Sequence, residues 1–182
     1  MRQTHPSTSG ATATQRRPAR TGLGEGDVYW FYGDQAIVRS PEGAWPIIIE
    51  HHMSHGASTP LHVHEDLDDS FLLLAGTLAV RCGDETLVAR PGDYVSMPVG
   101  VPHVFRVVGD EDAVLLQTHA TTTFLDFIKA VGTPAASGRP DPASLDYAAM
   151  NDVATRTGQP VLGPPMTADE ADAIVAADRR SQ

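Results

Sequence analysis

The sequence predicts an all-β protein, a jelly-roll barrel with C-terminal helices packed outside it. Between Gly26 and about His119, short β-rich runs are separated by turn residues every eight to twelve positions, the spacing typical of a sandwich or barrel. No helical period interrupts these runs, whereas apolar residues recur at helical spacing after Thr121. We therefore expect three segments: a disordered leader at 1–22, a β-barrel at 23–120 and a helical extension packed on the barrel at 121–182.

Turn residues mark where the predicted strands end. Gly83-Asp84 lies between two β-rich runs and is typical of a two-residue hairpin, in which Gly supplies the positive φ. Pro91-Gly92 suits the centre of a type II turn, and Pro98 followed by Gly100 marks another reversal. The expected strands are Val28–Tyr32, Gln35–Arg39, Trp45–Met53, Ser70–Ala75, Thr77–Cys82, Glu85–Ala89, Tyr94–Met97, His103–Val107 and Ala113–His119.

Three helices are expected in the C-terminal extension. The first runs from Phe124 to Val131 and ends at Gly132, a favourable residue just beyond a helix. The second spans Leu145–Thr157, and the third begins at a Thr167–Glu170 capping box and continues to about Arg180. Because these helices carry no chemical motif, we interpret them as cover for a sheet or as contacts between subunits.

Composition limits the functions open to the chain. Its 182 residues carry a formal net charge of -10, and because residues 1–20 hold four arginines and no acid, the rest carries -14. Such an acidic body repels phosphate backbones and anionic lipids, so we expect no binding to nucleic acid or membranes. The leader is typical of a disordered segment, with a nucleic-acid or targeting arm as the alternative. The sequence contains no signal-peptide or membrane-spanning run, which predicts a soluble cytoplasmic protein.

Histidine is the notable residue type. Five of the eight histidines lie between His51 and His64. In an extended strand residues i and i+2 point to one face, so His62 and His64 can aim both rings at one point. Asp69 follows at the start of the next predicted strand. Cys82 is the only cysteine, so a bound metal must rest on nitrogen and oxygen atoms.

A second motif begins at Gly92. It comprises Gly, five residues, Pro-x-Gly, two residues and His103, and His103 starts a predicted strand that can bring a third imidazole to the first pair. Three neutral imidazoles and a carboxylate suit one divalent transition metal (Fe, Mn, Ni, Co, Cu or Zn) and leave positions open for water, substrate or dioxygen. The predicted metal ligands are His62, His64, Asp69 and His103.

The two motifs resemble those of the cupin superfamily, in their usual order and with a short gap between them. Eight of ten fixed positions match at the right spacing. The departures are Asp69, where the family usually has Glu, and Val107, where it has an Asn that is not a ligand. Over roughly residues 26–166, the chain resembles single-domain cupins related to bacterial quercetin 2,3-dioxygenases.

This resemblance implies a metal-dependent dioxygenase, an oxidoreductase that cleaves an enolisable, flavonol-like aromatic substrate with O2. Asp69 would then be a metal ligand and also the catalytic general base, taking the part of the family's Glu. Two alternatives remain open. One is an O2-independent isomerase, cyclase or lyase in which the metal acts as a Lewis acid, and the other is a non-catalytic protein that binds a small molecule.

Several further side chains also have predicted positions. His51 and His52 are adjacent in a strand, so at most one faces the cavity, and we favour a surface position over contact with a substrate. His119 ends the last strand, where it could line the barrel mouth. Family resemblance implies a homodimer, and the outward-pointing Leu72 and Leu74 are candidates for that contact or for helix packing. Four residues are expected in the apolar core: Phe71, Tyr94, Met97 and Phe105.

Overall fold

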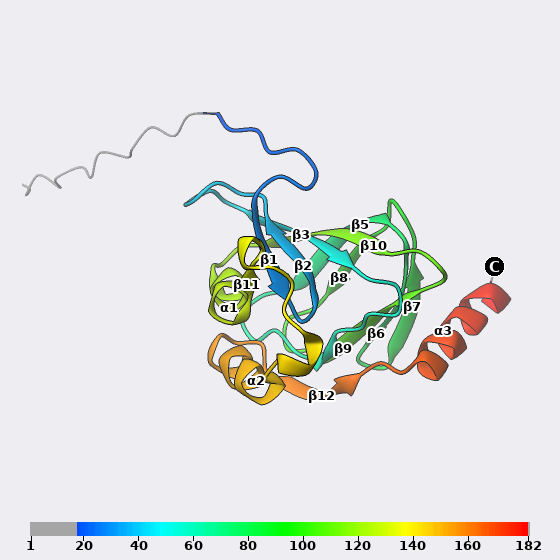
Figure 1. Ribbon diagram of the computed structural model, residues 1–182. Helices are drawn as coiled ribbons and strands as arrows, with labels where there is room; N and C mark the ends of the chain where they lie inside the picture. Colours follow the sequence, from blue (N-terminus) through cyan, green and yellow to red (C-terminus); the bar gives the residue numbers. More distant parts are fainter. Residues whose placement is uncertain (1–17, 182) are drawn as a thin grey trace, which may run out of the picture.

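The computed structural model describes residues 18–181, which form two antiparallel sheets packed face to face (Figure 1). Within this range the larger sheet has the strand order β11 (Thr133–Pro134), β1 (Asp27–Phe31), β2 (Asp34–Val38), β3 (Ile47–Met53), β10 (Ala113–His119), β5 (Asp69–Ala75), β8 (Tyr94–Met97). The smaller sheet has the order β12 (Val161–Pro165), β4 (Pro60–His62), β9 (His103–Val108), β6 (Thr77–Cys82), β7 (Glu85–Ala89). The predicted all-β jelly roll with C-terminal helices is thereby confirmed. Residues 1–17 of the predicted leader lie outside the described range.

The main core lies between the two sheets. Because side chains alternate along a strand, Phe71 and Leu73 of β5 point inward and are fully buried, whereas Leu72 points outward. Met97 and Phe105 are also buried there, as predicted. Tyr94 is a correction: it is 65% exposed, because its position on β8 points away from the core. The other members of this cluster are Met53, Leu78, Val80, Ala89, Val95, Val107, Ala113 and Leu115.

The tight turns follow the predicted chemistry. Gly83, between β6 and β7, has a φ of 57°, and the Asp93 amide donates to the Arg90 carbonyl across Pro91-Gly92. Gly76, which joins β5 to β6, has a φ of +77°. A Cβ atom there would lie 2.7 Å from both the Ala113 Cα and the Asp112 carbonyl oxygen, so only glycine fits.

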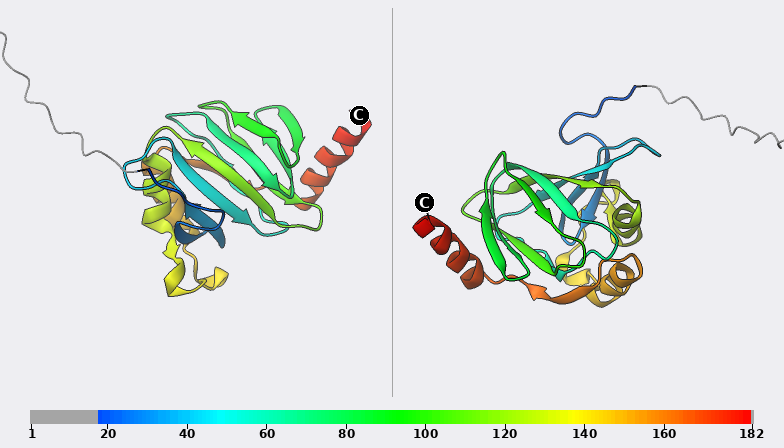
Figure 2. Two further views of the ribbon diagram at one scale, coloured as in Figure 1. Left: turned by 90° about the horizontal axis from the view of Figure 1, so that it is seen from above. Right: turned by 180° about the vertical axis from the view of Figure 1, so that it is seen from behind.

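Three α-helices are present in the described chain, as predicted: α1 (Thr123–Val131), α2 (Tyr147–Arg156) and α3 (Ala168–Ser181). Two short 3-10 turns precede α2, η1 (Ala135–Ser137) and η2 (Pro142–Ser144). The Thr167–Glu170 capping box forms, since the Glu170 amide donates to Thr167 Oγ1 and the Thr167 amide donates to Glu170 Oε2. Figure 2 shows α3 on one side of the sandwich and α1 at the opposite end.

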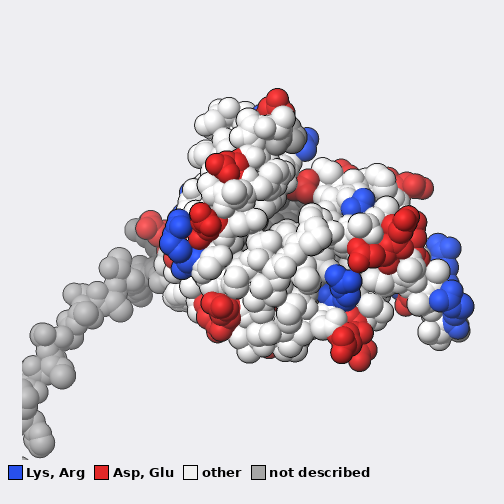
Figure 3. All heavy atoms as spheres, turned by 90° about the horizontal axis from the view of Figure 1, so that it is seen from below, with Lys and Arg blue, Asp and Glu red and all other residues white. Residues whose placement is uncertain are grey.

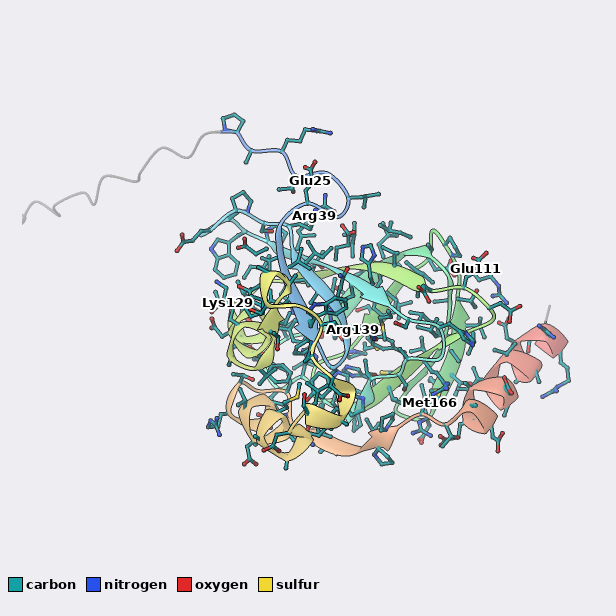
Figure 4. The ribbon with its side chains drawn as sticks, in the orientation of Figure 1. Glu25, Arg39, Glu111, Lys129, Arg139 and Met166 are labelled. Atoms are coloured by element: carbon teal, nitrogen blue, oxygen red, sulfur yellow. The ribbon has the colours of Figure 1, made fainter. Side chains whose placement is uncertain are left out.

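The C-terminal extension does more than cover the barrel from outside. Unexpectedly, β12 joins the smaller sheet beside β4, and β11 pairs with β1 at the edge of the larger sheet. Gly132 is therefore extended, with a φ of -73°, instead of the left-handed residue that commonly follows a helix. Glycine is still needed, because a Cβ atom would lie 2.5 Å from the Ile128 carbonyl oxygen. Met166, labelled in Figure 4, is buried between β12 and α3.

Charged groups lie mostly at the periphery of the molecule. Figure 3 shows a face with a broad uncharged centre and charged side chains around it. Two carboxylates are exceptions, since Glu50 and Asp69 are both buried. Glu50 of β3 pairs with Arg39 and His52 and accepts a bond from the Gly24 amide. These contacts attach the segment before β1 to the larger sheet. No helix in residues 18–181 is long and apolar enough to cross a membrane.

Candidate metal centre

Four predicted ligands come together at the centre of the sandwich. His62 ends β4 and His103 begins β9, and the two residues are paired across these neighbouring strands. Asp69 begins β5 in the opposite sheet. His64 lies two residues beyond the end of β4, so the expectation that one strand positions both rings holds only for His62. One potential ligand atom from each of the four side chains lies within 4.8 Å of the others.

Three of the four side chains in the cluster are almost completely shielded from solvent, and His62 is partly buried. His64, Asp69 and His103 are each at most 1% exposed. The ring centroid of His103 lies 4.4 Å from that of His62 and 5.5 Å from that of His64. Polar groups are buried at such density only where hydrogen bonds or an ion compensate their lost hydration.

Hydrogen bonds to backbone carbonyls determine which ring nitrogens of His62 and His103 face the centre of the cluster. His62 Nδ1 lies 2.8 Å from the Pro60 carbonyl oxygen, and His103 Nδ1 lies 2.9 Å from that of Val101. A carbonyl can only accept, so both Nδ1 atoms carry the proton and both Nε2 atoms expose a lone pair. This arrangement is the one by which proteins orient metal-binding histidines.

The two carboxylate oxygens of Asp69 also have different surroundings. Its Oδ1 accepts a 2.5 Å hydrogen bond from Gln117 Nε2. Its Oδ2 lies 3.8 Å from His64 Nε2 and 3.5 Å from His103 Nε2, and it is buried without a hydrogen-bond partner among the described residues. Ligand atoms held about 2.0–2.2 Å from one metal ion lie about 3.0–3.6 Å apart, close to these distances.

The neighbouring acids of this loop are engaged elsewhere. Asp66 accepts bonds from the hydroxyls of Thr121 and Thr123 at the start of α1, and Asp68 accepts a bond from the Val99 amide. Only Asp69 points into the cluster. Val107, the second departure from the expected motif, lies in the apolar core between the sheets and has no polar role.

Electrostatics keep the rings of His62 and His64 neutral and the carboxylate of Asp69 charged. Burial lowers the pKa of His62 to about 3, with the neighbouring rings of His103 and His64 adding to the effect. Burial also lowers the pKa of His64. Burial alone would raise the pKa of Asp69, but the interactions of its carboxylate with the nearby His103 and His64 outweigh burial and hold that pKa well below its usual range. Neutral imidazoles and an ionised carboxylate are the protonation states that bind a metal.

These observations fit a divalent transition metal ion. Buried atoms without a partner in the described structure include His64 Nε2, His103 Nε2 and Asp69 Oδ2, and all three face one point that His62 also reaches. A bound cation would satisfy them together. The cluster could therefore hold one metal ion on three nitrogens and one oxygen, a set that suits several first-row metals and does not distinguish between them.

A cavity of about 190 Å³ adjoins the cluster, and His62 and Asp69 reach its wall. Aromatic rings form much of the remaining wall: Phe31 of β1, Phe105 of β9, and Phe124 and Phe127 of α1. The C-terminal extension contributes further lining residues, namely Ala154, Gln159 and Val161. Helix α1 was expected only as cover for a sheet or as a subunit contact, and strand β12 was not predicted, yet both contribute walls to this cavity.

Three polar residues of this region were missed or misplaced by sequence reasoning. His51 lines the cavity, which corrects the expected surface position, while His52 on the other face of β3 contacts Glu50. His119 is 1% exposed and stacks on Phe124 with a centroid distance of 4.6 Å. Gln117 was not singled out. The pattern that could have identified it is a polar residue at one of the alternate, buried positions of β10, between Leu115 and His119.

Comparison with known proteins agrees with this geometry. Residues 49–119 match the family model described as "Cupin domain". A region of 97 residues, 51% of this chain, is 32% identical to quercetin 2,3-dioxygenase of Bacillus subtilis (strain 168). That region covers 28% of the Bacillus protein, so the chain spans less than a third of this relative.

The chain is also similar to two solved structures that are described as cupins. One is the cupin domain of Schizosaccharomyces pombe Cnp3, with 22% identity, coverage of 54% of this chain and 66% of that chain, and a TM-score of 0.45. The other is a sugar phosphate isomerase of the cupin superfamily from Silicibacter pomeroyi, with 21% identity, coverage of 50% and 61%, and a TM-score of 0.45. Such distant similarities identify no function.

Proposed function

We propose that this chain, which contains a cupin domain, is a metal-dependent dioxygenase that cleaves an enolisable aromatic substrate with O2. The observation that carries the proposal is the buried set of three imidazoles and one carboxylate beside a cavity walled by aromatic rings. The similarity to the Bacillus quercetin 2,3-dioxygenase supports the reaction class. A metal ion at this centre would act as a Lewis acid that lowers the pKa of a substrate hydroxyl and would bring substrate and O2 together.

The ligands proposed for this ion are His62 Nε2, His64 Nε2, His103 Nε2 and Asp69 Oδ2. Asp69 is shorter than the Glu usual in the family, but its position at the start of β5 brings Oδ2 within 3.5 Å of His103 Nε2. This distance supports a role as ligand. Its role as general base is less well supported, because a carboxylate whose pKa lies well below its usual range is a weak proton acceptor.

The cavity walls determine how a substrate sits. The rings of Phe124 and Phe127 from α1 and of Phe105 from β9 can pack on the faces or edges of an aromatic ring. They also exclude water, which strengthens the interaction of the charged carboxylate with groups near it. The apolar wall therefore binds the ring, and the cluster binds its oxygen.

Oxygen uptake tests the proposal. The protein is purified without a tag, its metal content is measured by elemental analysis, and O2 consumption is followed with flavonols and with one-ring enolisable phenols after loading with each first-row metal. We expect substrate-dependent uptake with at least one metal, and its loss in His62→Ala and His103→Ala. The matched control is His55→Ala, an exposed histidine outside the cluster.

Two results would contradict the dioxygenase. Turnover that continues under strict anaerobiosis would instead identify a metal-dependent isomerase, cyclase or lyase. Tight ligand binding without turnover across the whole panel, with metal bound, would identify a non-catalytic binding protein.

A further inference from the structure

His51 is singled out by comparing the polar groups that line the cavity. Most of them are engaged within the protein. Asp34 accepts bonds from Ser54, Tyr32 donates its hydroxyl to Asn151, and Gln159 bonds to Thr157. The others are also partnered: Ser58 with the carbonyls of Thr59 and Phe105, Thr59 with the Phe105 amide, and Gln117 with Asp69.

His51 Nε2 differs from these groups. Outside the four-residue cluster, it is the cavity-lining side-chain atom that is buried with no hydrogen-bond partner in the described structure. The residue lies on β3, directly opposite Leu115 of β10, and faces the interior. A buried, unpaired imidazole nitrogen costs free energy unless something pairs with it, which points to a ligand in the cavity.

The position of His51 places it across the cavity from part of the cluster. His62 enters from the smaller sheet, whereas His51 enters from the larger sheet. Between them the wall is largely aromatic, with Phe105 and Phe124 among the lining residues. Burial lowers the pKa of His51 to about 4, so the ring is neutral near pH 7 and its Nε2 can either donate or accept a hydrogen bond.

The size of the cavity limits the ligand. An engineered apolar cavity of about 150 Å³ holds one benzene ring. A cavity of about 190 Å³ therefore suits one ring with small substituents. A flavonol carries three rings, so most of it would have to stay outside.

We propose that His51 Nε2 hydrogen-bonds a second oxygen of the substrate, and that the substrate is a one-ring phenol with two oxygen substituents, the first of which is bound at the four-residue cluster. The proposal rests on the proposed function, since it places the reacting oxygen at that cluster. His51 is a specificity residue in this arrangement. His51 would stabilise the second oxygen of the substrate, and its Nε2 forms no hydrogen bond with the proposed metal ligands.

Binding to protein loaded with redox-inactive Zn²⁺ tests this proposal without turnover. The probes are phenol, the three dihydroxybenzenes and quercetin, and affinities are measured by calorimetry. We expect at least one dihydroxybenzene to bind about fivefold or more tighter than phenol, the value of one neutral hydrogen bond, and quercetin to bind more weakly than that compound.

Variants at position 51 isolate the hydrogen bond. His51→Phe should remove the advantage of the dihydroxybenzene while leaving the affinity for phenol nearly unchanged, and His51→Gln, which keeps a polar terminus, should restore part of it. His52→Phe makes the same change on the opposite face of β3 and should have no effect. If His51→Phe fails to fold, His51→Gln is compared with wild type instead. Its preference for the dihydroxybenzene over phenol should be smaller than that of wild type but still measurable.

The outcomes separate this proposal from the dioxygenase. Equal losses for phenol and the dihydroxybenzenes in His51→Phe would show a merely structural role, and failure of all four one-ring phenols to bind would refute the substrate class. Flavonol-dependent O2 uptake that is insensitive to His51 would overturn the inference while the dioxygenase stands. Binding that depends on His51, without any O2 uptake, would support the role of His51 and contradict the dioxygenase.

Discussion

Gln117 offers the sharpest test of how the candidate centre is built. Its amide donates a 2.5 Å hydrogen bond to Asp69 Oδ1 and leaves Oδ2 directed at the imidazoles. Gln117→Leu removes the donor but keeps most of the volume. A hydrogen bond to a charged group contributes about 1.5–3 kcal/mol, and its loss here leaves a buried carboxylate oxygen unpaired. Groups that orient metal ligands typically change metal affinity about 10–100-fold, so we expect a loss of that size.

Cobalt provides the assay, because Co²⁺ bound to nitrogen and oxygen ligands absorbs visible light and can be titrated against a chelator. Thr118→Ala is the matched control, since it lies on the opposite face of β10 and removes one hydrogen bond, to Ser70. The control should lower stability slightly and leave Co²⁺ affinity and spectrum unchanged. Unchanged or tighter Co²⁺ binding by Gln117→Leu would refute the claim that Gln117 orients Asp69.

Three further predictions follow from the structure. Burial lowers the pKa of His51 from its ordinary value to about 4, so the stability contributed by the neutral ring is present above about pH 6.5 and is lost as the pH falls toward 4. The loss of unfolding free energy amounts to roughly 2 kcal/mol at pH 5. In urea titrations, the stability of His51→Gln should decline less over that pH range than the stability of wild type. Gly76→Ala should lower the free energy of unfolding by about 2 kcal/mol or more. The control, Gly92→Ala, also has a positive φ but no atom within 4 Å of the added Cβ, so it should lower that free energy by only about 1 kcal/mol. Similar losses of stability in the two variants would contradict the role of close packing at Gly76. We propose that the exposed Leu72 and its neighbour Tyr94, on the outer sheet face, form a homodimer contact. Leu72→Glu should then shift the mass measured by light scattering from that of a dimer to that of a monomer. A wild-type protein that is monomeric at micromolar concentration would exclude the dimer.

Much of the barrel could be predicted because local patterns and core geometry coincide there. Alternation along β5 fixes which side chains face inward, and the turn at Gly83 requires the positive φ that glycine adopts readily. The convergence of His62 and His103 also follows from spacing, since both lie on neighbouring strands of one sheet. These are short-range rules, and they apply whatever the rest of the chain does.

The cavity could not be predicted in this way because it depends on contacts between distant segments. Phe124 is an ordinary apolar residue of an amphipathic helix, and only the docking of α1 at the barrel mouth makes it a cavity wall. Strand β12 contains Gly163 and two prolines, which weaken any strand signal, yet it pairs with β4. His51 was assigned to the surface since the pleat cannot say which face of β3 points inward.

The walls contributed by α1, α2 and β12 separate two tasks along the chain. Residues that would retain an ion come from the segment between His62 and His103, whereas part of the surface that would recognise an organic molecule comes from beyond position 120. Substitutions in the later segment can therefore redirect ligand preference while the ion-binding residues stay intact. In an evolving lineage, this arrangement would let new compounds be accepted without rebuilding the inorganic centre.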